Sequence, residues 1–348
     1  MKTPPPQDDL DPNALAALVA GRWGLPPLAL TYQALGFGSH HWRADAADGS
    51  GRRWFLTVDA RDGVHDSFTG LERALRTASA LHAQGGIAEV VAPLPDRAGE
   101  VLAILPGGHA TATAHDHGSW AVAVYPWLEV EPSQFGAFAS DADRENAQRL
   151  VARIHAATPL VPAGLPRRHD LGVPHRADLD AALARLDVPW TFGPFADATR
   201  EALRAHRSPL LAALAAYDRL AEAVLADPAP WVIAHGEPHP GNIVRRRDGA
   251  GLAIVDWDTC ALAPRERDLW QLLPPEADPA TGLAAYREVA GDVPVSADAL
   301  ALYRLWWDLC EVAIYTGWFT APHADTEDMR TGFGGLRESL GNLAAGFA

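Results

Sequence analysis

The segment that most restricts the fold of this chain is residues 231–258, WVIAHGEPHPGNIVRRRDGAGLAIVDWD. An apolar strand turns abruptly into a loop that carries two histidines, an acid and an amide among glycines and prolines. The stretches NIV and LAIVDWD then flank RRRDGAG, whose Asp-Gly pair is typical of a hairpin turn. The segment therefore predicts a β-hairpin that follows a polar loop and ends in a second group of acids.

Glu237, Asn242 and Asp256 follow one another at spacings that are typical of phosphoryl transfer. The acid and the amide are five residues apart, and Asp256 lies 14 residues further on. The kinase catalytic loop H-R-D-x-x-x-x-N has the same acid-to-amide spacing, and the Asp of D-F-G would fall at Asp256. Amide and carboxylate oxygens hold the Mg²⁺ that bridges the donor phosphates, and another carboxylate accepts the proton of the attacking hydroxyl. The alternative is an acidic loop beside a surface hairpin.

The region before this segment predicts a small α+β lobe. Residues 1–12 are polar and rich in proline, so we expect a flexible tail, followed by a short helix that Asp11 or Asn13 opens and Gly24 closes. Apolar patterning and turn signals predict strands at 30–35, 40–46, 53–58, 100–106 and 120–130, and a helix at 66–85. This order favours one antiparallel sheet with a helix inserted between its strands.

The chain becomes mainly helical after residues 126–134, a connector that contains two prolines. Helical spacing extends over 141–158, 175–186, 195–226, 266–273 and 296–319. Residues 158–175 are rich in proline, arginine and histidine and are expected to form a loop. This change in pattern predicts a smaller lobe over residues 1–127 and a larger helical lobe over residues 128–348.

Charge and composition narrow the class of partner. The 348 residues carry 29 Lys+Arg and 44 Asp+Glu, a formal net charge of −15, which disfavours nucleic acid because such binding relies on basic residues. The acids would suit a cationic small molecule, or they simply keep the surface soluble.

No apolar run approaches the ~20 residues that cross a bilayer. The N-terminus does not resemble a secretory signal, and the two cysteines have no paired spacing. We therefore expect a cytoplasmic protein without a membrane partner; the sequence does not determine its oligomeric state.

The motifs resemble those of the aminoglycoside phosphotransferase and choline kinase family, whose members are distant relatives of protein kinases. The family signature is a His-Gly-Asp loop with Asn five residues after the Asp, then a hairpin and an Ile/Val-Asp-Trp/Phe segment. Here these stretches read HGEPHPGN and IVDWD, APRERDLW matches the following family stretch in part, and LGFGSHHWRA fits the loop that covers the phosphates. GFGS alone also suits an ordinary turn. The resemblance covers about residues 30–345 and implies an α+β, two-lobed, protein-kinase-like fold.

The resemblance implies roles for the residues of the catalytic hairpin. Glu237 stands at the position of the catalytic base, and His235 would brace the loop through backbone contacts. Asp268 would fix the geometry of the loop from the following segment. The implied Mg²⁺ ligands are Asn242, Asp256 and Asp258.

The resemblance also implies that the smaller lobe binds a nucleotide, ATP or GTP. The implied contacts come from the glycine-rich loop, the sheet and the hinge: Gly36, Gly38, Ser39, Thr57, Tyr125, Trp127 and Leu128. The hinge backbone would pair with the edge of the purine. For Tyr125 and Trp127, packing in the core is the alternative.

Two positions depart from the family pattern, and the first is Thr57. The family's sheet carries a lysine that grips the donor phosphates in a stretch like FLKV, whereas this chain reads FLTV. The only lysine of the chain is at position 2, so no shifted alignment restores one, and Glu72 lacks its usual ion-pair partner. Arg43 on the adjacent strand is one candidate substitute, and His40, His41 and loop amides are the alternative.

The second departure is Glu237, where the family has Asp. One extra methylene moves the carboxylate by about 1.5 Å, and a misplacement of about 1 Å costs on the order of 10²-fold in rate. Pro238 and Pro240 suggest a different backbone path that compensates. The neighbouring His239 would contact a phosphate or nothing.

Asp308, Glu311 and Tyr315 share one face of the helix predicted at 296–319. The resemblance implies that carboxylates of the helical lobe hold amino groups of the acceptor, so these residues are candidate acceptor contacts; a solvated face is the alternative. Together the observations predict transfer of the γ-phosphoryl group of ATP or GTP to a hydroxyl of a small molecule, such as a cationic antibiotic or an aminosugar. Because of the two departures, the alternative is a nucleotide- or ligand-binding protein with impaired or altered chemistry.

Overall fold

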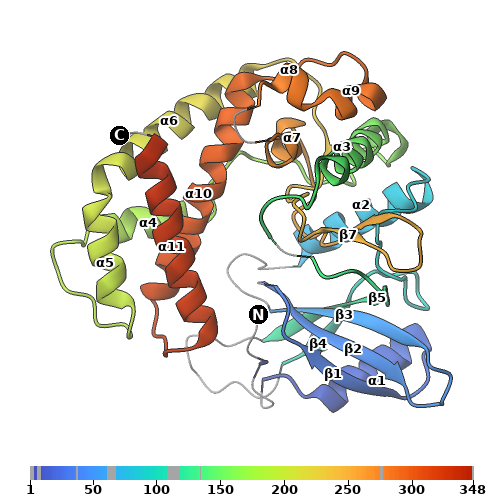
Figure 1. The fold of residues 1–348 in the computed structure, drawn as a ribbon. Helices are drawn as coiled ribbons and strands as arrows, with labels where there is room; N and C mark the ends of the chain where they lie inside the picture. Colours follow the sequence, from blue (N-terminus) through green and yellow to red (C-terminus); the bar gives the residue numbers. More distant parts are fainter. Residues whose placement is uncertain are drawn as a thin grey trace. The chain divides into compact units, whose positions relative to one another are not determined.

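The structure, a computed structural model, describes residues 4–5, 9–36, 38–60, 68–107, 118–133, 135–274 and 277–346. The chain divides into two compact units (Figure 1). The sheet unit combines Met1–Arg168 with Trp231–Val293, and the helical unit combines His169–Pro230 with Pro294–Ala348. The loop and hairpin of residues 231–258, which we call the catalytic hairpin, therefore belong to the same compact unit as the N-terminal sheet. A boundary between lobes at residues 127 and 128 stays a prediction.

The first helix, α1 (Pro12–Trp23), begins and ends at the residues that the sequence indicated. The side chain of Asp11 caps its N-terminus, and Gly24, with φ of +68°, ends it. Leu10, in the segment expected to be a tail, is only 2% exposed and belongs to the hydrophobic core of the sheet unit. Leu10 is therefore packed against the sheet unit and is not part of a flexible tail, and burying a leucine side chain contributes about 1.5–3 kcal/mol.

Five strands of the described chain form one antiparallel sheet in the order β1-β2-β3-β5-β4. The strands are β1 (Leu28–Gln33), β2 (His40–Ala46), β3 (Arg53–Ala60), β4 (Ala103–Pro106) and β5 (Ser119–Pro126). Helix α2 (Thr69–Ala83) lies between β3 and β4 in the sequence. All the predicted strands of this region and the inserted helix are present, with ends that differ by a few residues. The prediction of an α+β region with one antiparallel sheet is confirmed.

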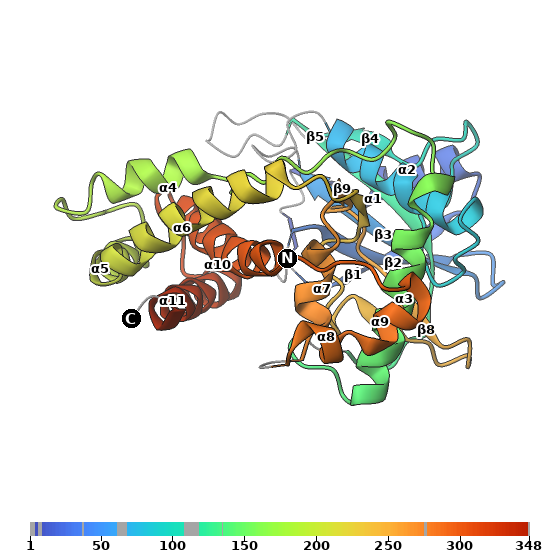
Figure 2. The same cartoon turned by 90° about the horizontal axis from the view of Figure 1, so that it is seen from above.

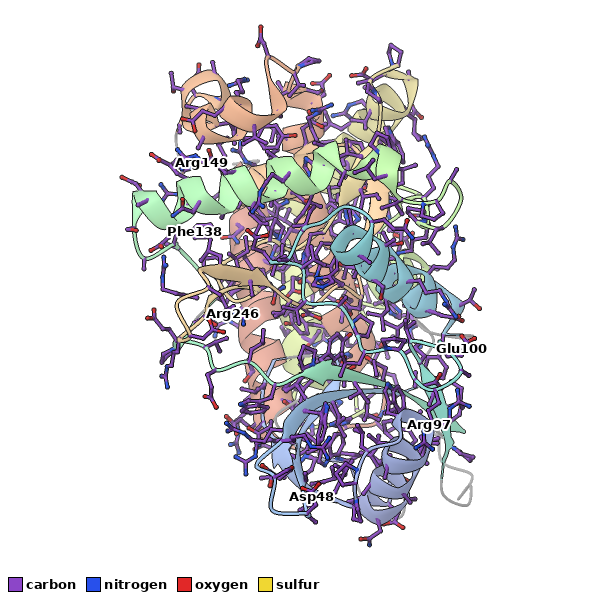
Figure 3. The ribbon with its side chains drawn as sticks, turned by 90° about the vertical axis from the view of Figure 1, so that its right-hand side faces the viewer. Asp48, Arg97, Glu100, Phe138, Arg149 and Arg246 are labelled. Carbon is purple, nitrogen blue, oxygen red and sulfur yellow. The ribbon has the colours of Figure 1, made fainter. Side chains whose placement is uncertain are left out.

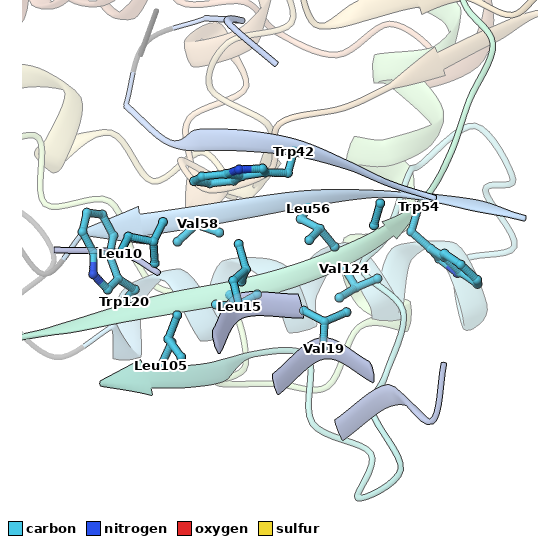
Figure 4. Close-up of a cluster of buried hydrophobic side chains, with 12 residues drawn as sticks. Leu10, Leu15, Val19, Trp42, Trp54, Leu56, Val58, Leu105, Trp120 and Val124 are labelled. Carbon is cyan, nitrogen blue, oxygen red and sulfur yellow. The ribbon is translucent and has the colours of Figure 1, made fainter. Parts of the chain in front are cut away.

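The two faces of this sheet differ in character because side chains alternate along each strand. One face is apolar and packs against α1 to form a core (Figure 4), which includes Leu15, Val19, Trp42, Leu56, Val58, Trp120 and Val124. The opposite face is more polar. By strand register it carries His41, Arg43, Phe55, Thr57, Asp59 and Tyr125. Thr57, which we expect to stand at the position of the family's lysine, is on this polar face.

The rest of the sheet unit surrounds the catalytic hairpin. Strand β6 (Val232–Ala234) pairs with β9 (Ala261–Ala263), and β7 (Ile243–Arg245) pairs with β8 (Leu252–Ile254). The helical elements here are α3 (Asp141–Ala156), a 3₁₀ turn (Thr158–Leu160), α7 (Glu266–Leu272), α8 (Pro279–Gly282) and α9 (Ala284–Ala290). Helix α3 packs against α7 and α9 (Figure 2). Figure 3 shows Arg149 on α3 and Arg246 on the β7–β8 hairpin.

The helical unit is built from long helices that pack side by side. Its elements are α4 (Arg176–Leu183), α5 (Ala196–Ala205), α6 (Arg207–Ala226), α10 (Ala297–Phe319) and α11 (Glu327–Gly346). Helices α6, α10 and α11 are in mutual contact (Figure 1). Sequence patterning did not indicate α11, and it merged α5 and α6, which the structure separates at His206. Within the described ranges, no helix is both long enough and apolar enough to span a bilayer.

Candidate active site

Asp268, on α7, holds the backbone of the loop that follows β6. Its carboxylate accepts hydrogen bonds from the N–H groups of His235 (2.9 Å) and Gly236 (2.6 Å), and Nε2 of His155 lies 3.0 Å from Oδ2. Burial alone would raise the pKa of Asp268, but its hydrogen bonds with His155 and with the Gly236 N–H lower it. Since hydrogen bonds to a charged acceptor contribute about 1.5–3 kcal/mol each, Asp268 anchors the start of the loop.

Gly236 is required at the start of this loop for two reasons. Its φ of +103° is unfavourable for any residue with a side chain, and an added Cβ would lie 2.5 Å from the guanidinium of the buried Arg267. Nη1 of Arg267 donates to the carbonyl of Thr259 at 2.9 Å, and Oγ1 of Thr259 donates to the carbonyl of His235 at 2.9 Å. The segment after β8 therefore supports the loop from a second side.

His235 is completely buried and binds backbone groups with both ring nitrogens. Its Nε2 lies 2.8 Å from the carbonyl of Val255, which only accepts, so Nε2 carries the proton. Its Nδ1 accepts the N–H of Glu237 at 3.2 Å, and the ring packs edge-on against Trp257. Burial lowers the pKa of His235 to about 4, so the ring is neutral near pH 7. These backbone contacts are those expected of a residue that braces the loop.

The Glu237 carboxylate is partly exposed and lies next to His239. Oε2 of Glu237 is 3.8 Å from Nε2 of His239. Burial would raise the pKa of Glu237, but the nearby side chain of His239 and the charge of the buried Arg267 lower it. Glu237 is therefore ionised near neutral pH, which is the form that a general base requires.

The β7–β8 hairpin brings Asn242 next to the residue that precedes Asp256. The N–H of Val255 donates to the carbonyl of Asn242 at 2.9 Å. Nδ2 of the buried Asn242 donates to the carbonyl of Glu237 at 3.0 Å, so its side-chain oxygen is the atom that can serve as a ligand. Asp256 has φ of +67°, a left-handed conformation that costs a non-glycine residue about 1–3 kcal/mol. Strain of this kind is typical of residues whose position serves a function.

Four carboxylates influence one another around the hairpin. Desolvation by the surrounding protein and the negative charges of Asp258, Glu237 and Asp59 raise the pKa of Asp256 well above its ordinary value. Asp256 is exposed, and the negative charges of its three neighbours oppose its ionisation. A bound cation would relieve this repulsion and return Asp256 to its ionised form.

The donor groups of the hairpin fit a Mg²⁺ ion that a nucleotide helps to bind. Mg²⁺ prefers oxygen ligands and is commonly held by one or two carboxylates together with phosphates and water. The side chains of Asn242, Asp256 and Asp258 offer such oxygens. In the part of the chain that the structure describes, no three His, Cys, Asp or Glu side chains are arranged to hold a metal by themselves.

The structure gives Glu72 a partner other than a lysine. Glu72, at the start of α2, accepts a hydrogen bond from Nε of Arg76 at 2.8 Å, and Arg76 also binds Glu100. Glu72 therefore pairs with a residue of its own helix. The group beside Thr57 belongs to another residue, Tyr125. A hydrogen bond links Thr57 to the hydroxyl of Tyr125, whose pKa is raised first by burial and then by the charges of nearby aspartates on β3 and after β8.

None of the three side chains considered as substitutes for the lysine brings a positive charge to Thr57 in this structure. Arg43 shares the polar face but pairs with Asp45 at 2.8 Å. His41 lies directly across from Thr57, and burial lowers its pKa to about 4, so it is neutral near pH 7. His40 pairs with a residue of the apolar face and is buried beside Trp42 and Trp120 rings. The suggestion that one of these residues replaces the lysine is not supported.

The glycine-rich loop and the hinge flank the polar face of the sheet. Gly36 and Gly38 have φ of +58° and +90°, and Oγ of Ser39 donates to Oδ1 of the buried Asp59 at 2.5 Å. Between these glycines, residue 37 lies outside the described ranges. Asp59 thus fixes the end of the loop to β3.

At the hinge, Trp127 and Leu128 follow β5. Nε1 of Trp127 donates to Oε1 of Glu129 at 3.0 Å, and the Arg53 guanidinium lies 5.5 Å from the centre of the Trp127 ring. These contacts are at the surface, so packing in the core does not explain Trp127. Tyr125, on the polar face of β5, likewise does not belong to the apolar core. Nucleotide contact stays a prediction for all three residues.

The candidate acceptor residues lie in the helical unit, between α10 and α11. Oδ1 of Asp308 accepts a hydrogen bond from Asn342 at 3.1 Å, and burial raises the pKa of Asp308. Tyr315 is 8% exposed, shares a hydrogen bond with Glu311, and packs where an added Cβ at Gly335 would lie 2.7 Å from its ring. A solvated face is therefore not the explanation for Tyr315. Contact with an acceptor stays a prediction for all three residues.

Sequence reasoning missed several residues that shape this site. His155, on α3, connects Asp268 to the hydroxyl of Tyr286, which lies 2.9 Å from its Nδ1. Arg267 supports Gly236, and Asp59 holds Ser39. A histidine at a position of the α3 segment with apolar helical spacing was a usable signal for His155, whereas nothing in the local pattern distinguishes Arg267.

Comparison with known proteins decides the family. Residues 34–303 match the Phosphotransferase enzyme family (APH). The chain belongs to the APH family. Protein StrN of Streptomyces griseus, a curated relative, is 29% identical over 264 residues, which cover 72% of this chain and 71% of StrN.

Solved structures show the same fold as this APH-family chain. The spectinomycin phosphotransferase APH(9)-Ia, in complex with ADP and spectinomycin, has a TM-score of 0.70 at 17% identity and covers 95% of this chain and 97% of its own. A microcompartment-associated aminopropanol kinase has a TM-score of 0.63 at 15% identity, with 95% and 96% covered. The predicted kinase-like fold class is confirmed, and so is the prediction that the protein is a small-molecule phosphotransferase.

Proposed function

We propose that this APH-family protein transfers the γ-phosphoryl group of ATP or GTP to a hydroxyl of a small cationic molecule, with Glu237 as the base and Mg²⁺ held through Asn242 and Asp256. One arrangement carries the proposal. The base, the amide and the strained aspartate belong to a single loop and hairpin, and Asp268 anchors the start of that loop. A binding module without chemistry would not need an ionised carboxylate at residue 237.

In the proposed reaction, the acceptor's hydroxyl oxygen attacks the γ-phosphorus, and the bond to the oxygen bridging the β-phosphate breaks. The hydroxyl proton passes to the carboxylate of Glu237. The products are a phosphate ester and ADP or GDP. Mg²⁺ would supply charge neutralisation on the donor phosphates, which matters more here because Thr57 brings no charge of its own. Glu237 orients the acceptor, and His235 keeps its backbone fixed.

The acceptor class follows from charge. The chain has a formal net charge of −15, and its candidate acceptor residues include Asp308 and Glu311. Acidic groups attract and orient ammonium groups. Two proteins with a similar fold are named for spectinomycin and for aminopropanol. We therefore propose an amine-bearing acceptor, such as an antibiotic or an aminosugar, used in the cytoplasm, where the nucleotide is available and Cys260 and Cys310 stay reduced.

The test has two stages. Thermal-shift titrations with ATP, GTP and Mg²⁺ measure donor binding, and coupled release of ADP or GDP measures transfer to spectinomycin, aminopropanol and aminosugars. We expect stabilisation by one nucleotide with Mg²⁺, product with at least one amine-bearing acceptor, and a loss of at least about 10²-fold in kcat for Glu237→Gln. If no nucleotide stabilises the protein, with or without metal, the proposal fails.

A second candidate is a family member that binds nucleotide or ligand in a regulatory role without efficient transfer. It is favoured by one observation: the described residues near Thr57 that could replace the lysine are committed elsewhere or neutral. This candidate gains if nucleotide binds but no acceptor yields product and Glu237→Gln leaves the background hydrolysis unchanged.

A further inference from the structure

His239 occupies a site that is shaped around its ring. The N–H of Gly241 donates to Nδ1 of His239 at 3.1 Å. An added Cβ at Gly241 would lie 3.0 Å from two atoms of the imidazole, so the glycine leaves room for the ring. Phe135, which is 67% exposed, packs edge-on against the other side with 4.8 Å between ring centres. The ring is therefore in contact with Gly241 and with Phe135.

The hydrogen bond from Gly241 determines where the proton of the ring lies. Because Nδ1 accepts an N–H, the neutral imidazole of His239 carries its proton on Nε2. That atom is 3.4 Å from Nδ2 of Asn242 and 3.8 Å from Oε2 of Glu237. Nδ2 of Asn242 is itself a donor, since it binds the carbonyl of Glu237 at 3.0 Å. Of these two neighbours, only the carboxylate can accept the Nε2 proton.

We propose that His239 is a positioning residue that selects the reactive orientation of Glu237. This inference rests on the proposed function. Glu has one more rotatable bond than Asp, so its carboxylate has more positions to sample, and the extra methylene shifts it by about 1.5 Å. An N–H fixed on one side of the carboxylate favours the rotamers in which Oε2 faces the ring. A side chain that is longer than the family's then becomes usable because a neighbour restricts it.

The distance of 3.8 Å is longer than an ordinary hydrogen bond. Under this proposal a rotation about the terminal torsions of Glu237 would bring Oε2 within hydrogen-bond distance of the ring. Contacts of catalytic groups commonly tighten when substrates bind. The shorter carboxylate of Glu237→Asp would withdraw from the ring by about 1.5 Å and lose the contact.

The test is a double-mutant cycle that separates the two sides of the ring. His239→Asn keeps an acceptor near Nδ1 for the Gly241 N–H but removes the Nε2 donor, whereas His239→Gln carries an amide N–H near Nε2. His239→Asn is expected to lower kcat by about 10- to 100-fold with the nucleotide KM within about 2-fold, and His239→Gln to recover part of the loss. In a Glu237→Asp background, His239→Asn is expected to change kcat by less than about 3-fold. His175→Asn, at a partly exposed residue with φ of 58° that Asn tolerates, is the matched control and should not change kcat.

Three outcomes overturn the inference. One is a kcat for His239→Asn within 2-fold of the wild type. Another is a raised nucleotide KM with unchanged kcat, which would mean that His239 contacts a phosphate. The third is an equal effect in the Glu237→Asp background.

If the wild type transfers phosphate to no acceptor, the proposed function fails. Crystal structures of the wild type and of His239→Asn then test the inference separately. An unchanged Glu237 rotamer in His239→Asn overturns it, and a displaced or disordered Glu237 side chain supports it.

Discussion

Nε2 of His155 lies 3.0 Å from Oδ2 of Asp268; both side chains are buried, and the two residues are 113 positions apart in the sequence. The same carboxylate accepts the backbone N–H groups of His235 and Gly236. The ring of His155 also reaches Tyr286 on α9. Helices α3, α7 and α9 are thereby connected to the loop that carries Glu237.

The first prediction concerns the charge of Asp268. Asp268→Asn keeps the size of the side chain but replaces one acceptor oxygen with a donor, so one backbone N–H of the loop loses its partner. We expect the free energy of unfolding, measured in urea, to fall by about 3–5 kcal/mol. The exposed Asp178→Asn should change it by less than about 0.5 kcal/mol. A loss below 1 kcal/mol for Asp268→Asn would contradict the anchoring role.

The stability that Asp268 contributes should also depend on pH. Because the pKa of its carboxyl is lower in the folded chain than in the unfolded chain, folding favours the ionised form. The contribution is complete above the unfolded-state pKa of about 3.9 and is lost as the pH falls through the folded-state pKa. The difference in unfolding free energy between wild type and Asp268→Asn should therefore be constant from pH 7 to about 5 and shrink below about 4. A difference that already disappears at pH 6 would exclude this carboxyl as the cause.

Two glycines should respond in opposite ways to a single methyl group. Gly236→Ala puts a Cβ at φ of +103° and 2.5 Å from the Arg267 guanidinium, so we expect a loss of at least about 1–3 kcal/mol in unfolding free energy and a reduced kcat. Gly341→Ala, on α11 with no atom within 4 Å of an added Cβ, should gain about 0.5–1 kcal/mol from helix propensity. Equal stabilities of the two variants, measured by urea or thermal unfolding, would contradict the close contact between Gly236 and Arg267.

Thr57→Lys is expected to tighten nucleotide binding. The new ammonium would stand on the polar face of the sheet near Asp59 and Tyr125, where the donor phosphates are proposed to bind. We expect the nucleotide KM to fall by about 3- to 10-fold, because a charge-assisted contact with phosphate is restored. Thr57→Met, whose side chain is similar in length to lysine but uncharged, should not lower the nucleotide KM. An unchanged or raised KM for Thr57→Lys would show that this face does not contact the phosphates.

The order of elements in the sheet unit could be predicted because it rests on local physics. Alternation in β2 and β3, the cap of Asp11 and the left-handed Gly24 each depend on a few neighbouring residues. The hairpin that carries Asn242 follows from an Asp-Gly turn between two apolar stretches. The weaker local signals were missed or misread: the 20-residue α11 was not indicated, and Leu10 was assigned to a tail although it is buried.

The sequence by itself determined which groups stand along the chain, an acid, an amide and a second acid, and their spacing resembles that of the APH family. Only the tertiary structure decided which side chains hold those groups. His155 reaches Asp268, Arg267 lies against Gly236 and Asp59 accepts from Ser39, each across 20 or more positions of the chain, and Glu72 binds Arg76. Even His239, two residues from Glu237, required the positions of Gly241 and Phe135 before its proton could be assigned. Spacing is a property of the chain, whereas hydrogen-bond partners depend on how separate segments pack.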